Sequence, residues 1–147
     1  MHYVNIRSIN ANIEELDLLI GKLKSMPTII ICSETWHLPC PILNGYQMYY
    51  NNSKIKRADG SVIFIKSNLE HLTMIEEIVI NPNSLNKTSV NFLSILLKLN
   101  NRKFKIISTY RCHDIKKEDY IKSLEKFLIN NKNNKNHIIV GDFIIDF

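Results

Sequence analysis

Two carboxylates and two other polar side chains stand at the ends of apolar runs that are typical of β-strands. They are Asn5, Glu34, Tyr110 and Asp142. Carboxylate oxygens suit Mg²⁺, which keeps several waters and is usually shared with substrate phosphates. One Glu and one Asp at strand ends therefore predict a single-metal phosphodiesterase site, in which one carboxylate binds the metal ion and the other orients a water molecule. The alternative is that each carboxylate only caps a turn or a helix.

Three arginines could contact phosphate groups near such a site. Arg7 and Arg111 closely follow two of the strand ends, and Arg57 lies in a basic segment between two predicted strands. A guanidinium group offers paired N–H donors that match phosphate oxygens. We therefore take all three as candidate substrate-binding residues, with solvent exposure or pairing with an acid as the alternative.

Hydrophobic periodicity predicts a series of strands and two helices. Helices are expected at 13–23 and 117–130, where apolar residues recur every three or four positions. Strands are expected at 2–6, 28–32, 45–50, 61–66, 75–80, 90–99, 104–110 and 137–140. This order predicts a layered α/β architecture, in which active groups gather where loops leave the strand ends.

The composition is that of one globular domain. The chain has 147 residues, of which 45% are apolar and 22% charged, and its formal net charge is +5. The basic balance favours a polyanionic partner such as nucleic acid. The abundance of Asn, Ile and Lys in an A/T-rich gene is an alternative explanation for this charge.

Several other classes of protein are not expected from this sequence. The three scattered cysteines do not form a disulfide framework, and the first residues do not resemble a secretory leader. No apolar run approaches the roughly 18 residues that span a bilayer, and no G-x-G-x-x-G or Walker-type loop occurs. We therefore expect a soluble intracellular protein with no membrane contact and no nucleotide cofactor.

Six segments, in their order along the chain, resemble the motifs of a known superfamily. They are NIRSI at 5–9, SETW at 33–36, GYQMYYNN at 45–52, RADGSVIFIK at 57–66, TYRC at 109–112 and VGDFIID at 140–146. Together they resemble the endonuclease/exonuclease/phosphatase superfamily, and in particular the apurinic-type endonuclease domain of non-LTR retrotransposons. The resemblance implies a DNase I-like, four-layer α/β sandwich. Residues 1–147 would form one such domain, truncated at its C-terminus.

The resemblance also implies a role for each strand-end residue. Glu34 matches the metal-binding glutamate of the family, and Asn5 matches the asparagine that helps to organise metal and phosphate. Tyr110 matches the tyrosine that hydrogen-bonds the scissile phosphate, and Asp142 matches the aspartate that orients or deprotonates the attacking water. The implied cofactor is Mg²⁺, with Mn²⁺ as an alternative. The implied substrate is DNA, which places the protein in the nucleus.

Two departures from the family pattern predict impaired or no activity for this chain. Ile144 stands where the family has an asparagine, and the closing Ser-Asp-His motif of the family is absent. Loss of one oxyanion-type hydrogen-bond donor costs roughly 10² to 10³ in rate. Two alternatives to an active endonuclease therefore stay open. One is a DNA-binding remnant without catalysis, and the other is a phosphatase of the same superfamily that acts on small phosphoesters.

Overall fold

Strands and two helices make up most of the chain that the structure describes. This computed structural model describes residues 1–36, 42–51, 60–80, 88–99, 101–111, 115–132 and 136–143, with the backbone alone at 72–80, 88–89, 91 and 99. The order of the elements is β1 (His2–Asn5), α1 (Ile9–Gly21), β2 (Ile29–Ser33), β3 (Tyr46–Asn51), β4 (Ser61–Lys66), β5 (His71–Ile80), β6 (Thr88–Leu99), β7 (Arg102–Tyr110), α2 (Lys117–Asn130) and β8 (His137–Asp142).

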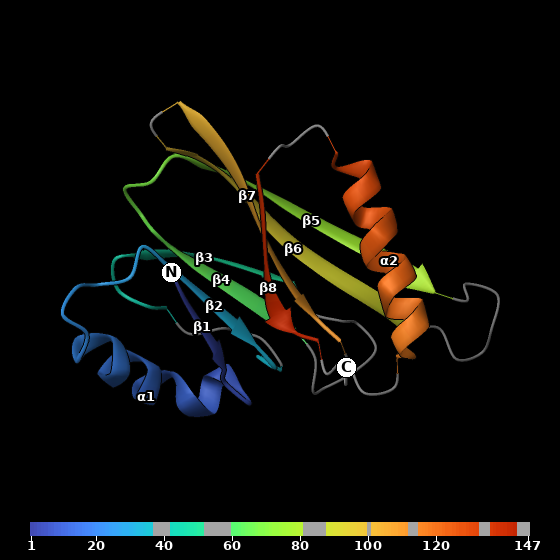
Figure 1. The fold of residues 1–147 in the computed structure, drawn as a ribbon. Coiled ribbons are helices and arrows are strands. Elements are labelled where there is room, and N and C mark those ends of the chain that lie inside the picture. The colour runs from blue at the N-terminus through green and yellow to red at the C-terminus, as the bar shows by residue number, and fades with distance from the viewer. Residues whose placement is uncertain are drawn as a thin grey trace.

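The strands form two four-stranded sheets. Sheet A has the strand order β1-β2-β4-β3, and sheet B has the order β5-β6-β7-β8. β1 pairs in parallel with β2 and β7 pairs in parallel with β8, each through a helical crossover. The strands of a parallel pair end at the same edge of their sheet. Figure 1 shows that β1, β2 and β8 end close together, and we call the place where these strands and β7 end the rim.

The two sheets pack face to face, and each helix covers the outer face of one sheet (Figure 1). Leu16 and Ile20 of α1 pack on sheet A, whereas Tyr120 and Phe127 of α2 pack on sheet B. The buried core between the sheets is aliphatic and consists of Ile29, Ile31, Ile63, Ile65, Leu93, Ile95, Leu97 and Ile106. The chain is therefore a four-layer α/β sandwich, as the sequence predicts.

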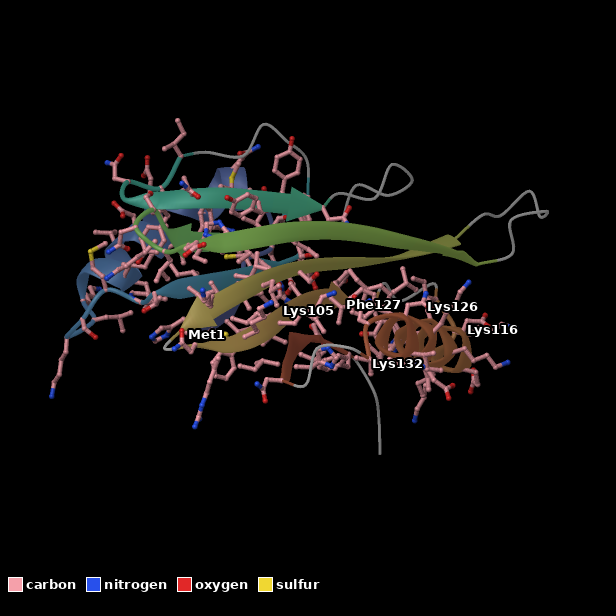
Figure 2. All side chains as sticks on the ribbon, turned by 90° about the horizontal axis from the view of Figure 1, so that it is seen from above. Met1, Lys105, Lys116, Lys126, Phe127 and Lys132 are labelled. Atoms are coloured by element: carbon pink, nitrogen blue, oxygen red, sulfur yellow. The ribbon has the colours of Figure 1, made fainter. Side chains whose placement is uncertain are left out.

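A buried lysine lies between sheet B and α2. Lys105 on β7 is 1% exposed, and its ammonium group donates a hydrogen bond to the side-chain carbonyl of Asn131, directly after α2. Figure 2 shows Lys105 beside Phe127, whose ring centre is 5.2 Å from the ammonium nitrogen. A buried cation is costly without such partners. These contacts hold the C-terminal end of α2 against sheet B.

The sequence-based bounds are confirmed for several elements and differ at others. β4 at Ser61–Lys66 and α2 at Lys117–Asn130 have the predicted bounds. β5 begins at His71 rather than at 75, because its backbone pairs with β6 from that residue onward. Neither helix in the described part of the chain is long and apolar enough to cross a membrane.

The first helix begins earlier than its apolar pattern predicts. α1 starts at Ile9 rather than at 13. The side-chain amide of Asn12 donates to the backbone carbonyls of Ile6 and Arg7, over 2.7 and 3.0 Å. These bonds tie the first turn of the helix to the chain that leaves β1. The apolar pattern predicts that Asn12 precedes the helix, whereas in the structure it lies within the first turn of α1.

β8 approaches β7 so closely that only glycine fits at position 141. A Cβ atom built there would overlap the backbone oxygen of Thr109. Thr109 is the register partner of Gly141, so a side chain would push the two strands apart directly before Asp142. The glycine of the VGDF segment therefore has a structural role in the placement of β8.

We predict that Gly141→Ala destabilises the fold and displaces the end of β8. Overpacking of this kind costs about 1–3 kcal/mol, which urea denaturation followed by circular dichroism can measure. The matched control is Gly21→Ala at the end of α1. A Cβ atom at that position meets nothing within 4 Å, and alanine is the better helix former. Equal stability of the two variants would contradict the close approach of β8 to β7.

Candidate active site

Two turns that leave β1 and β2 form one side of the rim. Arg7, Ser8 and Glu34 have left-handed φ angles of 45°, 83° and 54°, a conformation that costs about 1–3 kcal/mol in a non-glycine residue. Backbone hydrogen bonds join the two turns. The N–H of Ser8 donates to the carbonyl of Glu34 over 2.8 Å, and the N–H of Ile9 donates to the carbonyl of Thr35 over 3.1 Å. These bonds extend the β1–β2 pairing and hold the Glu34 backbone in place.

Four side chains that are far apart in the sequence meet at the rim. Asn5 Nδ2 donates to Glu34 Oε1 over 2.9 Å and to Asp142 Oδ2 over 3.4 Å. Tyr110 Oη donates to the same Glu34 oxygen over 3.3 Å. Tyr110 and Asp142 are register partners at the ends of β7 and β8, whereas Asn5 belongs to sheet A. The structure therefore brings together all four strand-end residues that the sequence singled out.

A tyrosine that the sequence analysis did not single out lies near the two carboxylates. Tyr3 Oη and Ser33 Oγ form a hydrogen bond of 2.7 Å. Burial raises the pKa of Tyr3, the hydrogen bond with Ser33 opposes this, and the charges of Asp142 and Glu34 raise the pKa further. The phenol therefore stays neutral near pH 7. Tyr3 precedes Asn5 by two positions and shares its face of the strand, which is the signal that could have identified it.

The three candidate substrate-binding arginines have different surroundings. Arg7 is exposed in the turn after β1, and Arg57 lies outside the described residues. The guanidinium group of Arg111 donates to the backbone carbonyls of Phe143 and Ile115, over 2.9 and 2.7 Å. Arg111 thus ties the end of β8 to the turn before α2. Of the two candidate arginines that the structure describes, Arg7 is the more accessible to a ligand.

The donor set at the rim has the chemistry of a magnesium site. In the described ranges, no group of three or more His, Cys, Asp or Glu side chains could hold a metal ion. The oxygens that converge belong to two carboxylates, Glu34 and Asp142, and the amide nitrogen of Asn5 donates to both. Mg²⁺ is usually held by one or two carboxylates, with waters and substrate phosphates as its other ligands. The residues present therefore fit Mg²⁺ and lack the nitrogen or sulfur ligands that favour Zn²⁺.

The fold of this chain is similar to that of several solved proteins, although no family model and no curated protein matches the sequence. An endonuclease/exonuclease/phosphatase family protein from Leptotrichia buccalis is 15% identical, with a TM-score of 0.68 over 98% of this chain and 66% of that one. The human Nocturnin catalytic domain is 19% identical, with a TM-score of 0.61 over 97% and 62%. D. rerio TDP2, complexed with a single-strand DNA product, is 12% identical, with a TM-score of 0.61 over 99% and 60%.

The likeness to these proteins covers nearly all of this chain. The chain spans 60–66% of the lengths of the three solved proteins. At identities of 12–19% the likeness concerns the fold. It agrees with the six sequence segments and with the observed order of layers. The chain has the fold of the endonuclease/exonuclease/phosphatase superfamily.

Proposed function

We propose that this chain is a phosphodiesterase domain that cleaves DNA with Mg²⁺, or with Mn²⁺ in its place. The observation that carries the proposal is the convergence of Asn5, Glu34 and Asp142, in which the amide nitrogen lies 2.9 and 3.4 Å from the two carboxylates. Asn5 is exposed, so a phosphate group can reach this cluster from solvent. Mg²⁺ is usually held by one or two carboxylates together with a substrate phosphate, so Glu34 can hold the ion while Asp142 stays available to the attacking water.

Each of the four residues has a distinct task in this proposal. Glu34 holds the metal ion, and Asp142 accepts a proton from the attacking water as general base. The bound ion supplies positive charge that offsets the charge developing on the scissile phosphate. The Tyr110 hydroxyl redirects its hydrogen from Glu34 to a phosphate oxygen when substrate is present. Asn5 donates to both carboxylates and keeps them at a constant separation.

Positive charge and sequence motifs support DNA as the substrate. The net charge of the chain is +5. Lys116, Lys126 and Lys132 are exposed on α2 and at its two ends (Figure 2), where they attract the phosphates of a nucleic acid. The six motif segments support an origin in a non-LTR retrotransposon, and therefore a nuclear location.

We further infer that the rate of cleavage by this chain is low. An asparagine at position 144 could donate a hydrogen bond to the phosphate or to a metal-bound water, whereas the side chain of Ile144 cannot. One such donor contributes roughly 10² to 10³ in rate. The DNA-binding remnant and the small-phosphoester phosphatase are the two alternatives that an experiment must separate from a slow nuclease.

We predict that the chain nicks supercoiled plasmid at or near background with Mg²⁺, and that Ile144→Asn raises the rate by about 10²-fold. Glu34→Gln or Asp142→Asn, each combined with Ile144→Asn, should abolish this gain. Glu125→Gln neutralises an exposed carboxylate of α2 and is the matched control. Combined with Ile144→Asn, it should leave the gain in rate unchanged.

Two other outcomes of this assay would contradict the nuclease. Salt-sensitive DNA binding without any nicking, unchanged in Glu34→Gln, would identify a binding remnant, since phosphate contacts are electrostatic. Turnover of small phosphomonoesters, with no effect of DNA, would identify a phosphatase.

We predict that Asn5→Asp makes the stability of the protein depend on Mg²⁺. The substitution adds a third carboxylate beside Glu34 and Asp142 and removes their shared donor. It should lower the free energy of unfolding by about 1–3 kcal/mol. Added Mg²⁺ should recover more stability in this variant than in the wild type, as measured by thermal melting. Asn68→Asp, in the exposed turn before β5, is the control, and an equal response of both variants to Mg²⁺ would contradict a metal site at Asn5.

A further inference from the structure

The side chain of Tyr3 lies on the edge strand of sheet A, on the same face as Asn5. Tyr3 is opposite Ile31, which belongs to the core between the sheets, so this is the inner face of the sheet. Two residues along a strand correspond to about 7 Å between Tyr3 and Asn5. No strand of the described chain pairs with the outer side of β1, and Tyr3 is 38% exposed. Solvent therefore reaches this tyrosine beside the proposed site.

The hydrogen bond between Tyr3 and Ser33 has a favoured direction. Either oxygen could donate across the 2.7 Å between Tyr3 Oη and Ser33 Oγ. Ser33 is 0% exposed, and within the described ranges Tyr3 is the only partner of its hydroxyl group. If Tyr3 donated, the Ser33 hydrogen would be buried without an acceptor, which destabilises a fold. We therefore infer that Ser33 donates and that Tyr3 accepts.

This direction leaves the hydrogen of the Tyr3 hydroxyl group available to a ligand. A phenol oxygen can accept one hydrogen bond and donate another at the same time. Burial raises the pKa of Tyr3, and the charges of Asp142 and Glu34 raise it further. The hydroxyl group therefore keeps its hydrogen near pH 7 and faces the region in which the two carboxylates lie.

We propose that Tyr3 is a further substrate-binding residue of the site, whose hydroxyl group donates its hydrogen bond to an anionic oxygen of the substrate phosphate at the rim. The inference rests on the proposed function, because it adds a contact to the same substrate. Ser33 is a positioning residue in this arrangement, since its donated hydrogen bond fixes the phenol oxygen of Tyr3.

The chemistry of Tyr3 favours a phosphate oxygen over a metal ion. A phenol that stays neutral offers a hydrogen, whereas Mg²⁺ takes oxygen ligands that are mostly carboxylates, waters and phosphates. A hydrogen bond to an anionic oxygen is also stronger than one between neutral groups. Tyr110 differs from Tyr3, because it is 6% exposed and already donates to Glu34. Tyr3 can therefore meet a phosphate without giving up a hydrogen bond to the protein.

The test measures affinity for a short single-stranded DNA oligonucleotide. The titrations use Ca²⁺ in place of Mg²⁺, since Ca²⁺ also takes oxygen ligands, and gel electrophoresis checks that the DNA stays intact. We expect Tyr3→Phe to bind about 10-fold more weakly than the wild type. Tyr50→Phe is the matched control. It removes a phenol that is 41% exposed, opposite Val62 on the outer face of sheet A, and should bind as the wild type does.

Ser33→Ala separates binding from support of the fold. Tyr3→Phe leaves the buried Ser33 hydroxyl group without an acceptor, so its melting temperature should fall by a few degrees. Adding Ser33→Ala to Tyr3→Phe removes that unpaired donor and should recover the melting temperature. The affinity of this double variant should stay low. Ser33→Ala alone keeps the Tyr3 hydrogen and should bind DNA within about 2-fold of the wild type.

Neutral methylphosphonate linkages then identify the acceptor. Each phosphate of the oligonucleotide is replaced in turn, and binding is measured for the wild type and Tyr3→Phe. We expect one position at which the replacement weakens wild-type binding and has no further effect on the variant. At the other positions the two proteins should lose affinity by equal factors.

Two results would overturn the Tyr3 contact. The first is equal affinity of Tyr3→Phe and the wild type for the unmodified oligonucleotide. The second is a double variant that recovers affinity together with melting temperature, which would show that Tyr3 only supports the fold. The proposed function fails separately. A chain that binds a phosphate through Tyr3 but does not hydrolyse DNA, even as Ile144→Asn, would keep this contact and refute the phosphodiesterase.

Discussion

One amide that bridges two carboxylates from different sheets is the interaction on which the site depends. Asn5 Nδ2 has two hydrogens, and Glu34 and Asp142 each accept from it. Two carboxylates held this close repel each other unless donors or a cation offset their charge. The amide and the Tyr110 hydroxyl supply the donors, and a divalent ion would supply the cation. The position of one sheet relative to the other therefore determines whether the site forms.

The packing of the four layers sets that relative position. The aliphatic core between the sheets is close-packed, and such interiors resist small displacements. Both parallel strand pairs end at the rim, and the close approach at Gly141 places Asp142 opposite Tyr110. The Glu34 backbone is strained, with a φ angle of 54°. This strain lowers stability at the Glu34 turn, and the packed cores on both faces of each sheet compensate for it.

The local pattern of the sequence predicted the elements with the clearest periodicity. α2 has a continuous apolar stripe and β4 has an uninterrupted β-branched and aromatic run, and both have the predicted bounds. The start of α1 at Ile9 and that of β5 at His71 were placed too late. A side-chain bond from Asn12 sets the first, and pairing with β6 sets the second. Local hydrophobic periodicity predicts neither of these contacts.

The sequence by itself determined which residues are the candidates for the chemistry, because Asn5, Glu34, Tyr110 and Asp142 follow recognisable strands and stand in an ordered series of motifs. Only the tertiary structure decided that these four meet. The reason is physical: register and sheet packing arise from contacts between residues as far as 137 positions apart. The spacing of residues along the sequence does not predict such contacts, because they form only when the two sheets pack against each other around their shared core.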